Sequence, residues 1–116
     1  MAITEAYTNS GSIGNIEFSL PNNAAYSSAS PIVSTGVYQF FVDTGAMLSG
    51  DVYDLKVYEK VTSAGSSRQI YAATMAGRQA GPFMSSSFIL MNGWDITMKW
   101  TAGAYRTIGW SIRKVA

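Results

Sequence analysis

The clearest pattern along the chain is an alternation of apolar and polar side chains over residues 94–101. Tryptophan, isoleucine and methionine occupy every second position there, and aspartate, threonine and lysine occupy the positions between them. The alternation resumes after a loop at 102–104, with Ile108, Trp110 and Ile112 on one side. A period of two predicts two β-strands, each with one buried face and one face in water.

We predict that residues 83–115 form a three-stranded antiparallel meander. Asn92-Gly93 is typical of a two-residue hairpin turn of type I′, and this turn would place Ile89 and Met91 on the same buried face as the tryptophans. A three-residue loop at 102–104 would keep the apolar faces of the last two strands on one side. Such a sheet needs a second layer to cover its apolar face.

Four further segments have strand patterns. The segment 37–42 is apolar on both faces, which predicts an interior strand, and Tyr53, Leu55 and Val57 define an inward face in 52–61. The remaining two segments begin near residues 16 and 68. With frequent turn residues and no convincing helix, the chain is predicted to be all-β: a single-domain antiparallel β-sandwich, jelly-roll-like, with seven or eight strands.

Residues 1–12 are mostly alanine, threonine, asparagine, serine and glycine, with Ile3 and Tyr7 as the only large apolar anchors. We predict an extended N-terminal arm here, followed by a sandwich domain over 13–116. The arm is open to two interpretations, a frayed terminus or a segment that lies across a neighbouring subunit. In both cases it would make few contacts with its own domain.

The hairpin of residues 52–76 is predicted to expose a contact surface. A four-residue loop at 62–65 would pair Glu59 with Arg68 and leave four apolar or aromatic side chains on the outer face. Residues of these types are enriched at interface centres, so we expect this surface to meet a second copy or another protein. A register shifted by one residue would instead turn two of them inward, Tyr71 and Met75. The predicted contact residues, together with the anchors of the arm, are Ile3, Tyr7, Val52, Tyr58, Tyr71 and Met75.

The composition limits the classes of function that the chain can have. A chain of 116 residues has room for one core. Charged residues make up only 13% of it, against about 25% in an ordinary soluble domain, which favours a surface of uncharged polar residues that is partly covered by other chains. A net charge of +1 without a basic stripe does not indicate nucleic acid as a partner. No apolar run is long enough for a membrane span, and residues 1–5 do not have the pattern of a signal peptide.

The chemistry available to the side chains is limited. The sequence contains no histidine and no cysteine, which removes the commonest general base, the thiol nucleophile and most transition-metal ligands. Asp51 and Asp54 are close together, but they stand at a strand start, where aspartate is a common turn residue. The three tryptophans could form a sugar-binding platform, although their positions favour the core. We therefore predict a protein that is not an enzyme and that has no catalytic, cofactor or metal site.

Three segments, YDLKVYEKV (53–61), GWDITMK (93–99) and RTIGWSIR (106–113), resemble small structural proteins of tailed phages. Proteins of this size and composition are similar to capsid decoration or cement proteins, in which a β-sandwich or jelly-roll domain sits on the phage head. The resemblance implies a virion protein on the capsid exterior, made in the host cytoplasm, which binds the major capsid protein and forms a homodimer or homotrimer. The alternative is a tail, fibre or baseplate module that binds host surface glycans.

Overall fold

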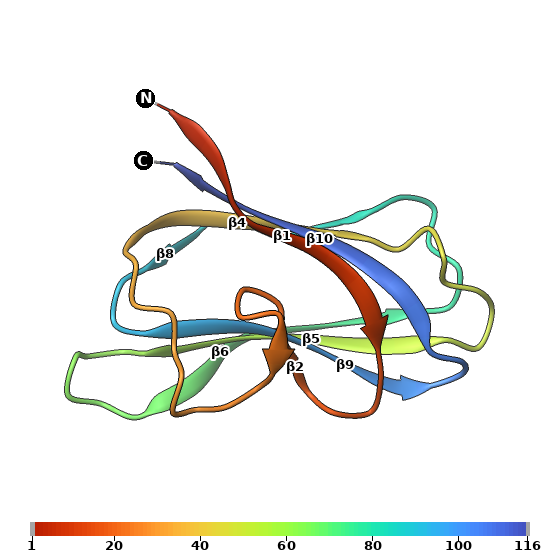
Figure 1. Ribbon diagram of the computed structural model, residues 1–116, viewed down its shortest axis with the longest axis horizontal. Coiled ribbons are helices and arrows are strands. Elements are labelled where there is room, and N and C mark those ends of the chain that lie inside the picture. Colours follow the sequence, from red (N-terminus) through yellow and green to blue (C-terminus); the bar gives the residue numbers. More distant parts are fainter. Residues whose placement is uncertain (1, 116) are drawn as a thin grey trace.

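The computed structural model describes residues 2–115 and consists of two antiparallel β-sheets packed face to face. Strands make up 59% of the structure, and no helix occurs among the described residues. Figure 1 shows the two layers edge-on, with strands β1, β4 and β10 in the upper layer and β2, β5, β6 and β9 in the lower. The predicted all-β sandwich is confirmed, although four of its ten strands are only two or three residues long.

The first sheet has the order β1-β10-β4-β7, and β8 also pairs with β4. Its strands are β1 (Ile3–Ile13), β4 (Gly36–Asp43), β7 (Phe83–Met84), β8 (Phe88–Leu90) and β10 (Arg106–Val115). Because β4 lies between β10 and the two short strands, it is the interior strand that its two apolar faces predicted.

The second sheet has the order β3-β2-β9-β5-β6. Its strands are β2 (Phe18–Ser19), β3 (Ala24–Ala25), β5 (Val52–Lys60), β6 (Ser67–Ala76) and β9 (Trp94–Ala102). The strand expected near residue 16 is confined to Phe18–Ser19, and Ile16 is 65% exposed, not half-buried. Ser19 is buried instead, because β2 pairs with β9 and its hydroxyl reaches a buried carboxylate there.

The core lies between the sheets, and the predicted inward faces are correct for the long strands. Tyr53, Leu55 and Val57 are fully buried on β5. The alternating apolar residues of β9 and β10 are buried as well: Trp94, Ile96, Met98, Ile108, Trp110 and Ile112. Burial of Trp94 and Trp110 confirms that these two residues belong to the core, whereas Trp100 is half-buried at the end of β9.

The predicted meander over 83–115 is wrong. β9 pairs with β5 and β2, β10 pairs with β1 and β4, and β8 pairs with β4. The chain therefore changes sheet at both connections, and the apolar faces of β9 and β10 meet across the core instead of lying side by side. The turn also differs from type I′, because φ is positive at Gly93 (90°) but not at Asn92.

A second correction follows at β8. Ile89 is 76% exposed and Met91 is 57% exposed, while Leu90 between them is fully buried. The reason is the pairing of β8 with β4, which sets Ile89 opposite Val37 on the outer face of the first sheet.

The predicted N-terminal arm is also wrong. Residues 3–13 form strand β1, which pairs with β10 from Ile3 opposite Val115 to Ile13 opposite Arg106. The segment was predicted to be an arm because its side chains are mostly polar. An edge strand, however, is held by backbone pairing and needs only a few inward apolar residues. Tyr7 and Ile13 supply them here. The expected boundary between residues 12 and 13 thus falls inside a strand.

Candidate binding surfaces

The predicted contact residues of the 52–76 hairpin lie on both faces of the second sheet and do not form one surface. Met75 is 2% exposed and belongs to the core. Tyr71 is half-buried opposite Val57 and packs edge-on against Phe88, with ring centroids 5.3 Å apart. Val52 is half-buried between β6 and β9.

A β-bulge explains the difference. Glu59 pairs with Arg68 as predicted, but the register shifts between Val57 and Tyr58, so that Val57 faces Tyr71 instead of Ile70. One extra residue reverses the face of every side chain that follows it. The alternative register, with Tyr71 and Met75 inward, is therefore the correct one beyond the bulge.

Tyr58 stays on the outer face but is covered by residues 17–26 of the same chain, which contain β2 and β3 and are called the β2–β3 segment below. Its ring stacks on Tyr26, with centroids 4.8 Å apart, and its hydroxyl donates to Glu17 Oε2 at 2.7 Å. Burial and the bond to the Glu17 carboxylate raise the pKa of Tyr58. Thr97 donates to the same carboxylate oxygen at 2.6 Å, so this cluster fastens the segment to the sheet.

Asp95 is buried beneath the same segment, with 2% of its surface exposed. Its Oδ1 accepts hydrogen bonds from Ser19 Oγ at 2.7 Å and from the Ile96 amide at 2.8 Å, while Oδ2 has no protein partner among the described residues. Burial raises the pKa of Asp95 to about 6; the Ser19 and Ile96 bonds oppose this shift, and the nearby Glu17 adds to it. This burial could not be predicted from the local pattern, since Asp95 alternates with apolar residues as a solvent-facing residue would.

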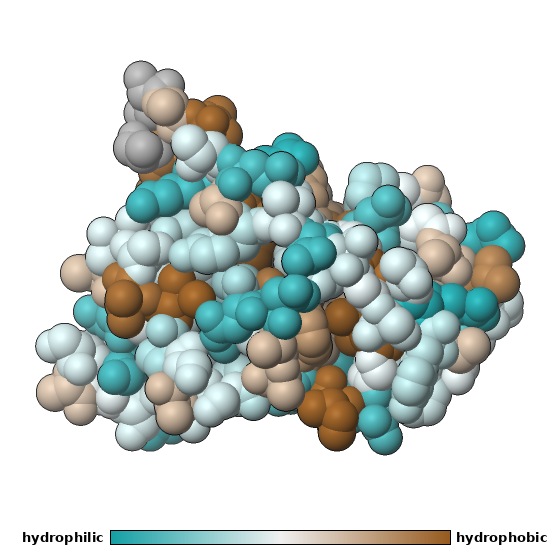
Figure 2. Space-filling view, in the orientation of Figure 1, coloured by the Kyte–Doolittle hydropathy of each residue, from teal (hydrophilic) through white to brown (hydrophobic). Residues whose placement is uncertain are grey.

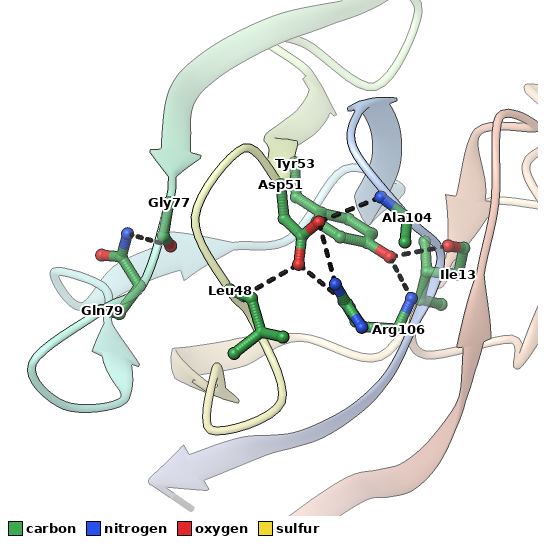
Figure 3. A network of polar contacts seen from close by, with 8 residues as sticks. All are labelled: Ile13, Leu48, Asp51, Tyr53, Gly77, Gln79, Ala104 and Arg106. Carbon is green, nitrogen blue, oxygen red and sulfur yellow. Dashed lines mark hydrogen bonds and ion pairs between the residues drawn. The ribbon is translucent and has the colours of Figure 1, made fainter.

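The other buried carboxylate, Asp51, joins two loops at one end of the sandwich (Figure 3). Arg106 Nε donates to Asp51 Oδ2 at 2.6 Å, and the amides of Leu48 and Ala104 donate to its two oxygens at 2.8 and 3.0 Å. The Arg106 bond and then the two amides hold the pKa of Asp51 well below its usual range. Nearby, the Tyr53 hydroxyl donates to the Ile13 carbonyl and accepts from the Arg106 amide, each at 2.9 Å.

The structure also shows that Asp51 and Asp54, which are close together in the sequence, do not form a pair of neighbouring carboxylates. Asp54 lies on the opposite face of β5, where its Oδ1 accepts a hydrogen bond from Thr74. The two carboxylates are therefore not brought together. Asp51 acts as a structural anchor that ties the loop before β5 to the β9–β10 connection.

An apolar row crosses the outer face of the first sheet. Successive strands place Ile3 opposite Val115, Val115 opposite Val37, and Val37 opposite Ile89. Ile3 is 72% exposed and Ile89 76%, and the two valines between them are half-buried. Of the two arm residues predicted to contact a partner, Ile3 is therefore exposed. Tyr7 points into the sandwich, with its ring centroid 6.0 Å from that of Trp94.

A groove of about 470 Å³ lies further along the same face. The Arg113 guanidinium lies 3.9 Å from the centroid of the Phe41 ring at its side, and Gly109, which has no side chain, lies between Ser10 and Asp43 in the sheet. The lining combines two aromatic residues, one carboxylate, one guanidinium and several hydroxyl or amide groups: Thr8, Asn9, Phe41, Val42, Asp43, Pro82, Gly109, Trp110, Ser111 and Arg113.

Comparison with known proteins found no match to the chain among protein-family models, curated proteins or solved structures. Within residues 2–115, no helix is long and apolar enough to cross a membrane.

Proposed function

We propose that the chain is a non-enzymatic structural protein that acts by binding other proteins, as a decoration or cement protein on the exterior of a phage capsid. The observation that supports this most strongly is the apolar row Ile3–Val115–Val37–Ile89 on the outer face of the first sheet. Single exposed apolar residues are common on soluble proteins, but contiguous ones mark contact surfaces. In this proposal the row meets the major capsid protein.

The surroundings of the row fit a protein interface. The next residues along the same strands, Glu5, Arg113 and Gln39, are opposite one another in the sheet and would form a polar rim beside the apolar centre. The row lies on paired strands, so little order would be lost on binding. The low content of charged residues and the resemblance of the strand segments to phage structural proteins support the same setting.

The experiment has two steps. Gel densitometry of purified particles gives the copy number, and we expect hundreds of copies per particle; a dozen or fewer would contradict a decoration protein. Purified chain is then added to capsid shells that lack it. Replacing a hot-spot residue costs about 2 kcal/mol or more of binding free energy, so Ile89→Asp should weaken binding about 30-fold. Val61→Asp is the matched control, because Val61 is similarly exposed, at 72% against 76% for Ile89, but lies just after β5, a strand of the other sheet.

The groove favours a second candidate function, the binding of host glycans by a tail, fibre or baseplate module. A carboxylate, a guanidinium and hydroxyl groups can hydrogen-bond sugar hydroxyls, and Phe41 supplies an apolar contact. Gly109→Val tests this idea, because a Cβ at Gly109 meets its neighbours only at 3.7 Å or more and a valine would fill the groove. Saturable binding on a glycan array that Gly109→Val abolishes and Gly11→Val preserves would favour this function over the first.

A further inference from the structure

Strand β1 is a long edge without the usual protection against pairing. It pairs with β10 on one side, and no other described strand pairs with its second side. After the bulge between Glu5 and Tyr7, residues 7–13 contain no charge, no proline and no further irregularity. Natural proteins normally protect exposed edge strands from pairing by means of charged residues, prolines or bulges. In Figure 2, the side of the molecule that presents β1 is mostly pale or teal, with scattered brown residues.

One hydrogen bond shows which backbone groups of β1 face away from β10. The Ser10 amide donates to Oδ1 of its neighbour Asn9 at 2.8 Å, so it is not engaged with β10. Backbone groups alternate between the two sides of an antiparallel strand. Thr8, Ser10 and Ser12 therefore direct their amides and carbonyls away from β10, toward the free side.

We propose that β1 pairs antiparallel with β1 of a second copy about a two-fold axis at Ser10. Ser10 would lie opposite Ser10 of the second copy, and Thr8 opposite Ser12. Each opposed pair exchanges two hydrogen bonds, which gives about six in total. At Ser10 the amide would exchange its bond to Asn9 Oδ1 for one to the second copy. Side chains on the outer face stay on the outer face in this register, as strand pairing requires.

The strand is complementary to itself in this register. Small hydroxyl side chains meet on the outer face, and Asn9 meets Gly11, where a Cβ would have no atom within 4 Å. Glu5 would lie beyond the paired stretch, so that no like charges approach each other. Edge strand β6 is the competing surface, but it contains Arg68 and a break in its ladder at Ile70. Pairing of two copies through β1 is therefore favoured over pairing through β6.

The dimer would join the two first sheets into one continuous sheet. An axis perpendicular to the sheet leaves both apolar rows on the same outer face, one at each end. This consequence rests on the proposed function: two rows on one dimer would bind two capsid subunits at once, and binding to one raises the effective concentration at the other.

Cross-linking tests the register directly, because the chain has no cysteine. In an opposed hydrogen-bonded pair the Cα atoms are about 5.5 Å apart, which suits a disulfide. Ser10→Cys should therefore give a disulfide-linked dimer under mild oxidation. Ala72→Cys is the matched control on the other edge, since Ala72 is also an exposed strand residue, and it should remain uncrosslinked.

Light scattering after gel filtration gives the state of the unmodified chain, which should have twice the 12.5 kDa mass of one chain. Ser10→Lys should be monomeric and folded, because two lysines would face each other, and mixing it with Ser10→Glu should restore a dimer.

A wild-type monomer at high concentration, a dimer unaffected by Ser10→Lys, or efficient cross-linking through Ala72→Cys would each overturn the proposal. If the wild type is monomeric yet present in hundreds of copies per particle, the dimer proposal is refuted and the decoration function is supported. If the wild type is a dimer but is absent from particles, the dimer proposal is supported and the decoration function is refuted.

Discussion

The raised pKa of Asp95 makes the stability of the fold depend on pH in a predictable direction. The carboxyl titrates near pH 6 in the folded chain, compared with an ordinary value of 3.8. Between these two values the folded state holds a proton that the unfolded state has lost. The stabilising effect of that proton is complete below pH 3.8 and is lost as the pH rises through 6.

The size of the effect can be worked out from the shift. About two pH units, at 1.36 kcal/mol each, correspond to about 3 kcal/mol. Relaxation of the covering β2–β3 segment and entry of water reduce the penalty of a buried charge, so we expect about 1 to 2 kcal/mol. The variant Asp95→Asn cannot titrate at this position and keeps an acceptor oxygen for the Ser19 and Ile96 bonds.

The assay is urea unfolding of wild type and Asp95→Asn at several pH values between 4.5 and 7.5, followed by tryptophan fluorescence. The difference between the two proteins is the quantity of interest, because contributions from other carboxylates cancel in it. We expect the free energy of unfolding of wild type, relative to Asp95→Asn, to fall by about 1 to 2 kcal/mol from pH 4.5 to pH 7.5. Ser19→Ala removes a bond that lowers the pKa of Asp95, so it should move the transition to higher pH. Parallel pH profiles for wild type and Asp95→Asn would refute the reasoning.

Three further predictions concern the fold. Arg106→Gln leaves the buried Asp51 carboxylate without its cation, so it should lower the melting temperature more than Arg113→Gln, an exposed arginine on the same strand; equal effects would contradict a structural role for the ion pair. Gly103→Ala should cost more than about 2 kcal/mol of unfolding free energy, because φ is 83° and a Cβ would clash with Asp51 Oδ1 and lie 2.6 Å from the Asp51 Cα atom. Gly77→Ala, with φ of 73° and no nearby atom, should cost only about 1 kcal/mol, and chemical denaturation compares the two. Deleting residues 1–12 should lower the melting temperature by about 10 °C or more, because it removes most of β1 and the inward Tyr7 from the sheet; a calorimetric midpoint close to that of the full chain would show that β1 adds little.

The alternation of side chains was sufficient to predict which residues are buried but not which strands are neighbours. The apolar faces of β9 and β10 would be satisfied equally by a shared sheet or by facing sheets, since both arrangements remove them from water. The choice depends on long-range pairing with β1, β4 and β5, and a local pattern contains no information about it.

The candidate surfaces were harder to predict for a related reason. A single bulge after Val57 reversed the faces of Tyr71 and Met75, and no turn residue marks it in the sequence. The apolar row draws its four residues from four different strands, so it exists only once the strand order is known. Likewise, Asp95 is buried by the distant β2–β3 segment and not by its own neighbours.

The adjacency of Ile3 and Val115 in the first sheet has a practical consequence for protein engineering. A short flexible linker from the end of β10 to the start of β1 would allow circular permutation, with new termini opened in the exposed loop between β5 and β6. A permuted chain would keep every strand pair of the sandwich while moving the free ends to the opposite sheet. Affinity tags or displayed peptides could then be fused far from Ile3, whereas fusions at the present ends would stand directly beside the apolar row and obstruct it.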